Sequence, residues 1–249
     1  MASPPSLKSL VQSSYDTIAP TYLTWTTTTT TSTPSTRLTY LHTLLPLLPP
    51  HARVLELGCG AGVPGTQTLL DAGHDVVAND ISAVQIGLAR ELLTGGGVDG
   101  EGEGEGGGGK RKGKVEFIQG DMMGLSFGEG SFDAVVGFYS IFHLPRGEQE
   151  VIIKKIGGWV RGGGYLLMNL GVMDGEGEGD GDGVLRGQFL GAEMFWARWR
   201  EAEARAVVER VGFRVEGGDG LEMVVRVDVE DGVEVPFLWV FGRKRAEGR

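Results

Sequence analysis

The sequence lacks the features that mark several classes of protein. Its 249 residues include one cysteine, Cys59, so no disulfide can form within the chain, and a reducing compartment fits this composition. The first residues, Met1 to Pro5, lack the charged and then apolar layout of a signal peptide. The apolar stretch from Leu44 to Leu57 is interrupted by prolines and charged residues, so it is too short to cross a membrane. We therefore expect a soluble cytoplasmic protein with no membrane partner.

Basic residues are in the minority. Lys and Arg number 23 against 33 Asp and Glu, which gives a formal net charge of -10 at pH 7. A nucleic-acid partner requires a broad basic face that neutralises phosphates. The one basic cluster, at residues 110–114, adjoins an acidic glycine-rich run. We interpret this cluster as part of a solvated loop and expect no nucleic-acid partner.

Glycine, by contrast, is abundant, with 43 residues in the chain. Most of the excess over a normal composition lies in low-complexity segments. Three such segments lie near residues 26–36, 95–113 and 174–183, and they consist largely of Thr and Ser or of Gly with charged residues. These compositions bury too little apolar area to offset the entropy lost on ordering. We expect three surface loop insertions, which mark boundaries between elements.

Apolar patterns between the insertions predict alternating helices and strands. We expect helices over 6–23, 37–48, 64–72, 83–93, 147–160 and 191–211, strands over 53–57, 75–79, 115–119, 132–138 and 164–170, and two or three further strands within 213–243. Near-continuous apolar strands that alternate with helices are typical of a parallel sheet covered on both faces. The predicted fold class is α/β, with a Rossmann-like, mostly parallel seven-stranded sheet and an antiparallel edge strand.

The chain length suits one sizeable domain. We expect residues 1–50 to form an N-terminal helical lid that belongs to this domain. Residues 51–249 are expected to form its core, interrupted by the loop insertions. The oligomeric state stays open.

The most informative segment joins the strand at 53–57 to the helix after it. Gly58, Gly60 and Gly62 follow this strand directly. Glycines at such a place allow a sharp turn and a close approach of the backbone to a ligand. Asp80 ends the next strand, where its carboxylate can accept hydrogen bonds from ribose hydroxyls. This arrangement predicts a site for a cofactor that contains a nucleoside.

Two classes of cofactor are compatible with the loop. Residues 60–65 match G-x-G-x-x-G, and Asp80 follows about 20 residues later, as in a nicotinamide dinucleotide site. However, the first glycine is Gly58, so the dinucleotide pattern begins one turn late. Pro64 also lacks the backbone N–H that a pyrophosphate would need. Glu56 would repel a pyrophosphate but attract an ammonium or a sulfonium.

Five motifs follow one another in a familiar order. They are Glu-Leu-Gly-Cys-Gly-Ala-Gly at 56–62, Asn-Asp-Ile-Ser at 79–82, Gly-Asp-Met at 120–122, Ser-Phe-Asp-Ala-Val-Val at 131–136 and Trp-Val-Arg-Gly-Gly-Gly at 159–164. Together they resemble the class I S-adenosylmethionine-dependent methyltransferases. One departure is Arg161, because the turn before the fifth strand usually contains Pro-Gly-Gly in this family.

Two further segments narrow the resemblance. Residues 15–22 resemble the Tyr-Asp-x-x-Ala-x-x-Tyr opening of many small-molecule methyltransferases. Residues 138–145, Phe-Tyr-Ser-Ile-Phe-His-Leu-Pro, resemble a fungal and bacterial subgroup of UbiE-like enzymes.

The resemblance implies roles for residues around the loop. Glu56 is expected to hold the methionine ammonium of the cofactor, and Asp80 to accept from the ribose hydroxyls, with Ile81 packed on the adenine face. Asp121 is expected to accept from the adenine amino group, beside Met122. The other residues expected at the cofactor are Gly58, Cys59, Gly60, Gly62, Phe138, Tyr15 and Tyr22.

His143 and Tyr139 are candidate catalytic residues, because both follow the fourth strand near the expected sulfonium. A histidine can act as a general base near neutral pH, although a His-Leu-Pro segment also occurs as a structural turn. Trp196 and Trp199, on the helix expected at 191–211, either line the substrate pocket or pack in the core. No metal site is expected.

The resemblance implies methyl transfer from S-adenosylmethionine to an O, N or S atom of a small-molecule acceptor. A sulfonium is already an activated leaving group, so catalysis can rest mainly on alignment and exclusion of water. Two alternatives stay open: an NAD(P)-dependent oxidoreductase and a non-catalytic cofactor-binding protein. The identity of the acceptor is left open by the sequence.

Overall fold

The computed structural model describes residues 6–32, 35–94, 112–173, 183–216, 218, 220–230 and 233–246. The insertions expected at 95–113 and 174–183 therefore lie almost wholly outside the described residues, and their loop character stays a prediction. Within the described ranges, no helix is long and apolar enough to cross a membrane.

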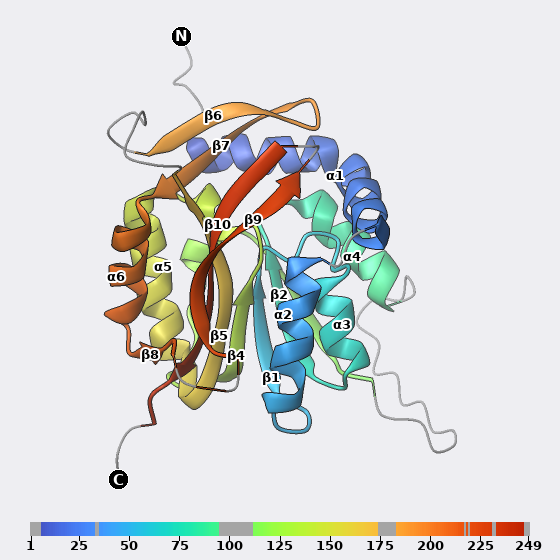
Figure 1. Ribbon diagram of the computed structural model, residues 1–249. Helices are drawn as coiled ribbons and strands as arrows, with labels where there is room; N and C mark the ends of the chain where they lie inside the picture. The colour runs from blue at the N-terminus through green and yellow to red at the C-terminus, as the bar shows by residue number, and fades with distance from the viewer. Residues whose placement is uncertain are drawn as a thin grey trace.

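Ten strands, counted over the described residues, form the sheet at the centre of the molecule (Figure 1). Its main path has the order β3-β2-β1-β4-β5-β10-β8. The parallel strands are β1 (Arg53–Leu57), β2 (Asp75–Asp80), β3 (Val115–Gln119), β4 (Phe132–Gly137) and β5 (Val160–Val172). The antiparallel edge contains β10 (Val233–Lys244), β8 (Phe213–Arg214) and β9 (Glu222–Glu230). The α/β class and the antiparallel edge are confirmed, whereas the predicted number of seven strands is too low.

Helices cover both faces of the sheet (Figure 1). The elements on one face are α2 (Thr36–Leu44), α3 (Gly65–Asp71) and α4 (Ala83–Thr94), and those on the other are α5 (Arg146–Trp159) and α6 (Glu201–Glu209). Side chains of a strand alternate between the two faces. Along β1, Leu55 and Leu57 pack in the cluster with α5 and α6, while Val54 packs in the cluster with α2 and α3. The two buried faces explain the near-continuous apolar strands.

The order of the strands reverses beside β1. This strand lies between β2 and β4, and the connections on its two sides run over opposite faces of the sheet. In open α/β sheets, ligands bind at the carboxyl ends of the strands at such a switch point. Two short 3₁₀ turns follow the strand ends here, η2 (Met122–Gly124) after β3 and η3 (Ile141–His143) after β4. The loops that carry the predicted site residues therefore meet at one edge.

Helix α1 (Leu7–Ser32) lies across this edge and is longer than the predicted helix at 6–23 (Figure 1). The prediction of a loop insertion over residues 26–36 is therefore wrong for residues 26–32, which are helical. Thr24, Thr27 and Thr28 each donate a hydroxyl hydrogen bond of 2.8–3.0 Å to the carbonyl four residues earlier. These bonds satisfy the threonine side chains within the helix. The helix expected at 37–48 becomes α2 followed by the 3₁₀ turn η1 (Leu45–Leu47).

A hairpin replaces the first half of the helix that the sequence predicted over 191–211. Strand β6 (Val184–Phe189) pairs with β7 (Ala192–Trp199) through the turn at 190–191, in which Leu190 and Gly191 have φ of 49° and 85°. Two-residue turns with positive φ are the usual hairpin connection. The helical prediction is wrong up to residue 200, because this aromatic segment packs as a strand, and only α6 is helical. Trp196 and Trp199 therefore lie on β7.

Strand β7 connects α1 to the sheet. It pairs in parallel with the end of β5 at Gly171 and Val172. On its other side, Phe195 packs in an apolar cluster with Val11 and Ile18 of α1. The hairpin thus holds α1 over the carboxyl ends of the parallel strands.

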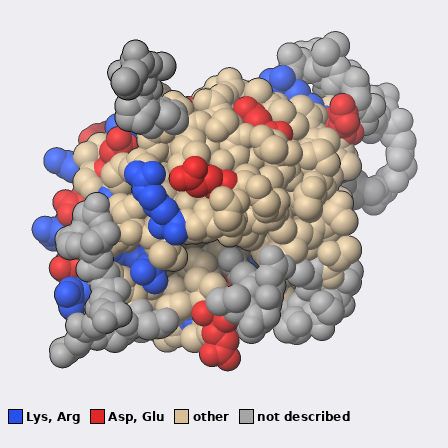
Figure 2. All heavy atoms as spheres, turned by 90° about the horizontal axis from the view of Figure 1, so that it is seen from above, with Lys and Arg blue, Asp and Glu red and all other residues tan. Residues whose placement is uncertain are grey.

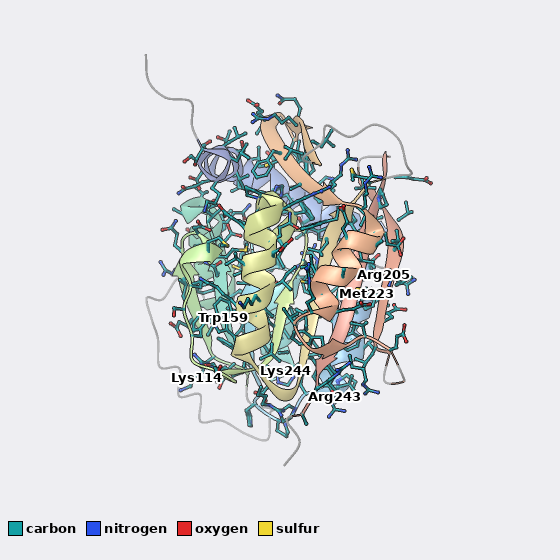
Figure 3. The ribbon with its side chains drawn as sticks, turned by 90° about the vertical axis from the view of Figure 1, so that its left-hand side faces the viewer. Lys114, Trp159, Arg205, Met223, Arg243 and Lys244 are labelled. Carbon is teal, nitrogen blue, oxygen red and sulfur yellow. The ribbon has the colours of Figure 1, made fainter. Side chains whose placement is uncertain are left out.

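Basic side chains fasten the antiparallel edge to its neighbours, and Figure 3 shows them beside α5 and α6. Arg205 of α6 donates a hydrogen bond of 2.6 Å to the carbonyl of Met223 on β9. Lys244 at the end of β10 donates to the carbonyl of Val160 over 2.8 Å. These bonds place the antiparallel edge firmly against β5 and α6.

Gln149 provides a test of how β7 is held. Its buried Nε2 donates to the carbonyl of Leu144, and its Oε1 accepts from Nε1 of Trp199, each over 2.7 Å. In Gln149→Met the indole N–H and the carbonyl lose their partners, at about 1–3 kcal/mol for each unsatisfied group. We expect urea denaturation to show a free energy of unfolding lower by about 2 kcal/mol or more. Gln188→Met, on the exposed side of β6, is the control, and equal stability of the two variants would contradict this role.

Candidate active site

A pocket lies at the carboxyl ends of β1 to β4, beneath α1. The space between its walls is about 830 Å³, including the part that is open to solvent. The predicted site residues that line it are Tyr15, Tyr22, Gly58, Cys59, Gly60, Asp80, Ile81, Asp121, Met122, Phe138, Tyr139 and His143. Glu56 and Gly62 are outside this lining. Residues separated widely in the sequence thus converge on one cavity.

The turn after β1 brings bare backbone to the pocket. Gly58, Gly60 and Gly62 have φ of 73°, 56° and 77°, which glycine adopts without strain. A Cβ at Gly58 would clash with the side chain of Ser140, and a Cβ at Gly62 would lie 2.5 Å from Cδ1 of Leu93. The glycines are therefore required both by the backbone conformation and by close packing.

Asp80 is buried at the end of β2, where it is held by the backbone of two loops. Its Oδ2 accepts from the N–H of Gly60 at 2.8 Å, and its Oδ1 accepts from the N–H of Ser82 at 2.9 Å. Burial raises the pKa of Asp80 to about 6, although both hydrogen bonds oppose this rise. A carboxylate has about four acceptor sites. Asp80 can therefore shape the glycine loop and still accept donors from a ligand.

Glu56 lies behind the glycine loop, on β1, and its side chain is buried. The hydroxyl of Thr66 donates to its Oε2 at 2.5 Å. Burial raises the pKa of Glu56 to about 7, against the lowering effects of the Thr66 hydrogen bond and of the nearby charge of Arg37. A Cβ on Gly65 would clash with the carboxylate, so α3 begins directly against it. The expected contact with an ammonium stays a prediction.

Asp121 is engaged by α1. Its Oδ1 accepts from the N–H of Met123 at 2.9 Å, and its Oδ2 accepts from Nζ of Lys8 at 2.6 Å. The same Nζ lies 3.0 Å from Glu148 of α5. Lys8 thus connects the start of α1 to the loop after β3 and to α5. The adenine contact expected of Asp121 stays a prediction.

His143 lies in the pocket wall, on η3, and is almost fully buried. Its Nδ1 is 2.8 Å from the carbonyl oxygen of Phe195, and its Nε2 is 3.0 Å from the hydroxyl of Tyr15. Burial lowers the pKa of His143 to about 4, so the ring is neutral at neutral pH. A carbonyl only accepts, so Nδ1 carries the proton, and Nε2 accepts from the Tyr15 hydroxyl.

Tyr139 forms another part of the wall. Its hydroxyl donates to Asp228 of β9 at 2.9 Å, and its ring packs edge-on against Trp239. The guanidinium of Arg37 lies 5.4 Å from the centre of the ring, within range of a cation–π interaction. Tyr139 therefore joins the pocket to the antiparallel edge.

Several lining residues escaped the sequence reasoning, and Gln85 is the most informative. Its side chain is buried and lines the pocket, yet among the described residues neither Nε2 nor Oε1 has a hydrogen-bond partner. The same holds for Oδ1 of Asn79. Buried polar atoms are normally paired, so the cavity suits a polar ligand. The only sequence signal, the spacing of Ser82 and Gln85, is typical of a helix start.

Arg37 of α2 and Lys8 of α1 are two further lining residues that the sequence reasoning missed. Each is an isolated basic residue on a helix, and no motif contains it.

Among the described residues, no group of three His, Cys, Asp or Glu side chains is placed to hold a metal ion. Seen from above, the face over α1 and the hairpin is mostly uncharged, with Lys, Arg, Asp and Glu scattered over it (Figure 2).

Comparison with known proteins identifies the central segment. Residues 54–164 match a family described as methyltransferase domain. The chain is 33% identical to the sterol 24-C-methyltransferase of Gibberella zeae over 96 residues. This match covers 39% of this chain and 22% of that protein. The matches span only 22% to 43% of the lengths of three curated relatives.

Solved structures match nearly the whole chain. Magnesium protoporphyrin IX methyltransferase from Synechocystis, with bound S-adenosylmethionine, has a TM-score of 0.61 at 14% identity and covers 98% of this chain and 100% of that one. The [4+2]-cyclase SpnF has a TM-score of 0.64 at 16% identity and covers 98% of each chain. At these identities the likeness shows the fold alone, which is the predicted Rossmann-like fold.

The glycine turn generates a prediction about stability. Gly58→Ala combines a left-handed φ with a clash against Ser140, and each effect costs about 1–3 kcal/mol. We expect a free energy of unfolding lower by about 2–6 kcal/mol in urea denaturation. Gly124→Ala is the matched control, because a Cβ there meets no atom within 4 Å. If the two variants were equally stable, the turn would not be as tightly packed as described.

Proposed function

We propose that this chain, whose residues 54–164 carry a class I S-adenosylmethionine-dependent methyltransferase domain, transfers a methyl group from S-adenosylmethionine to an O, N or S atom of a small-molecule acceptor. One observation carries the proposal. The glycine loop, the Asp80 carboxylate and the unpaired amide of Gln85 converge on one pocket at the switch point of the sheet. The family match and the order of the sequence motifs support it.

The residues of the pocket fit this cofactor. Asp80 would accept from the ribose hydroxyls, and the unpaired atoms of Gln85 and Asn79 would gain polar partners. Arg37 is suited to the carboxylate of the methionine part, and Glu56, behind the loop, to its positive charge. When bound, the cofactor supplies a sulfonium-activated methyl group. Asp121, Ile81 and Met122 would surround the adenine.

Catalysis then rests on alignment and on exclusion of water. We propose residues 1–50 as a helical lid within the same domain as residues 51–249. Tyr15 and Tyr22 line the pocket from α1, and Lys8 holds the start of this helix to Asp121 and Glu148. Opening of α1 would admit ligands, and closure would exclude water.

We also propose that the chain belongs to a narrower subgroup of the methyltransferases. Residues 15–22 and 138–145 support membership of a UbiE-like subgroup that acts on small molecules. We propose a cytoplasmic enzyme without nucleic-acid or membrane partners, in keeping with its acidic composition. Tyr139 and His143 are proposed near the reacting atoms. The bond from Tyr139 to Asp228 favours a role in shaping the acceptor side.

Two alternatives compete with methyl transfer. For an NAD(P)-dependent oxidoreductase, Pro64 stands at the start of α3, where it offers no N–H to a pyrophosphate, so a titration of NADH fluorescence should show no binding. A non-catalytic cofactor-binding protein would have no need of residues that bind a methyl acceptor beside the cofactor. The [4+2]-cyclase has a similar fold, so the fold alone does not identify the reaction.

Calorimetry with S-adenosylhomocysteine tests the cofactor site. We expect binding in the wild type, and a loss of about tenfold or more in Asp80→Asn, because hydrogen bonds to a charged acceptor contribute about 1.5–3 kcal/mol. The pKa of Asp80 is about 6, and ligand hydroxyls favour the ionised form. Affinity should therefore fall as the pH falls through 6 in the wild type and change less in the variant.

Asp71→Asn is the control for this experiment, because Asp71 lies at the exposed end of α3, outside the pocket lining. Circular dichroism checks that each variant is folded. No binding by the wild type at near-millimolar concentration would contradict the proposed cofactor, and unchanged affinity in Asp80→Asn would contradict the role of this carboxylate.

Labelled methyl transfer tests the reaction. The purified protein is incubated with methyl-labelled S-adenosylmethionine and an extract of its source, and the labelled product is isolated. We expect the label in a small molecule, with a rate lower by about tenfold or more for Asp80→Asn. Label found only in protein or nucleic acid would contradict a small-molecule acceptor, and no label would favour the non-catalytic alternative.

A further inference from the structure

Tyr15 and His143 form a hydrogen-bonded pair in the wall of the pocket. They lie 128 residues apart in the sequence, on α1 and η3, and both line the cavity. The ring of Tyr15 packs edge-on against His143 and against Tyr22, with centroid distances of 5.4 Å and 5.5 Å. The position of the Tyr15 hydroxyl is therefore set by packing on two sides as well as by its bond to Nε2.

The pair has a defined direction for protons. The carbonyl of Phe195 accepts from Nδ1 of His143, so Nε2 has a lone pair and accepts the hydrogen bond of the Tyr15 hydroxyl. The Tyr15 oxygen also has lone pairs, which can accept a proton from a ligand. A proton accepted there can be matched by the transfer of the phenolic proton to Nε2.

The charged groups of the pocket are less suited to this task. Asp80 is bonded to two backbone N–H groups, and Asp121 to one N–H and to Lys8. The other charged side chain of the lining, Arg37, is a cation and cannot accept a proton. Around Tyr15 and His143 the neighbouring side chains are aromatic: Tyr22, Phe142, Phe195 and Trp196. The pair is thus a neutral base in apolar surroundings.

We propose that Tyr15 is a catalytic residue that removes the proton of a hydroxyl acceptor, and that His143 takes up this proton through Tyr15. The inference rests on the proposed methyl transfer and names its acceptor class, a neutral phenol or a comparably acidic alcohol. Phenols have a pKa near 10 and stay protonated at neutral pH, whereas carboxylic acids ionise unaided. A proton relay in the wall therefore indicates methylation of a hydroxyl oxygen.

The acceptor O–H bond breaks, its proton passes to the Tyr15 oxygen, and the Tyr15 proton passes to Nε2 of His143. The freed electron pair of the acceptor forms the new O–C bond, while the C–S bond breaks and leaves its electron pair on sulfur. One positive charge is present before and after the step, first at sulfur and then on the imidazolium. The buried pocket therefore gains no net charge, and the carbonyl of Phe195 stabilises the imidazolium.

The ionisation of bound 4-nitrophenol tests the relay without turnover. This phenol turns yellow on ionisation, and sinefungin, an unreactive analogue whose ammonium takes the place of the sulfonium, fills the cofactor site. Burial lowers the pKa of a His143 ring that is charged alone, but a phenolate formed in the same pocket compensates the charge of the imidazolium. We therefore expect the pKa of bound nitrophenol in the wild type to lie about one unit below its solution value. Tyr15→Phe should lower the ratio of ionised to protonated nitrophenol about tenfold, which corresponds to one pKa unit.

His143→Gln separates a relay from a merely structural role. The Gln amide can donate to the Phe195 carbonyl and accept from Tyr15, so it can keep both hydrogen bonds, but it cannot hold the proton. We expect the same tenfold loss in His143→Gln. Tyr165→Phe and His42→Gln, both outside the pocket lining, are the matched controls and should retain the ionisation.

Three outcomes would overturn the inference: no binding of nitrophenol, no ionisation in the wild type, or ionisation that persists in either of the two pocket variants. Calorimetric binding of sinefungin is measured on each protein in parallel. If sinefungin binds and nitrophenol does not ionise, the relay fails while the proposed cofactor stands. If sinefungin itself does not bind, the proposed function fails with it.

Discussion

The hydrogen bond from the N–H of Gly60 to the buried carboxylate of Asp80 is the contact on which the site depends. A buried carboxylate must be hydrogen-bonded, and here the donors are backbone groups of the loops after β1 and β2. The N–H groups of Gly58 and Cys59 also donate to the carbonyl of Asn79, at 2.8 Å and 2.9 Å. The glycine turn is therefore locked onto β2.

The pocket has two sides of different chemistry. The side formed by the strand ends holds Asp80, Asn79 and Gln85, whose polar atoms suit a nucleoside. The side formed by α1 and η3 holds Tyr15 and His143 among aromatic rings, where burial keeps the imidazole neutral. Under the proposed function, this division would place the polar cofactor beside a less polar acceptor. The β6–β7 hairpin maintains it, because β7 both supports α1 and supplies the Phe195 carbonyl to His143.

Much of the site could be predicted because its signals are local. Gly58 and Asp80 stand at strand ends, and the chain around them is regular enough for the strands to be read from apolar runs. The hairpin could not be predicted, since Phe195 and Trp196 suit a helix or a strand equally until α1 covers them. Gln85 was missed because its spacing from Ser82 indicates only a helix start. The prediction of a loop at the threonines of α1 was wrong because their hydroxyls form hydrogen bonds within the helix.

The sequence by itself determined the α/β class, the glycine turn and a site for a cofactor that contains a nucleoside, because each depends on residues close together along the chain. Only the tertiary structure decided that Glu56 lies behind the loop, that Lys8 reaches Asp121, and that Tyr15 meets His143. The last two contacts join segments that are far apart in the sequence, and the packing of α1 against β7 brings α1 into place for them. The proton direction of the Tyr15–His143 pair depends on a backbone carbonyl, a group that every residue has and that no sequence pattern can single out.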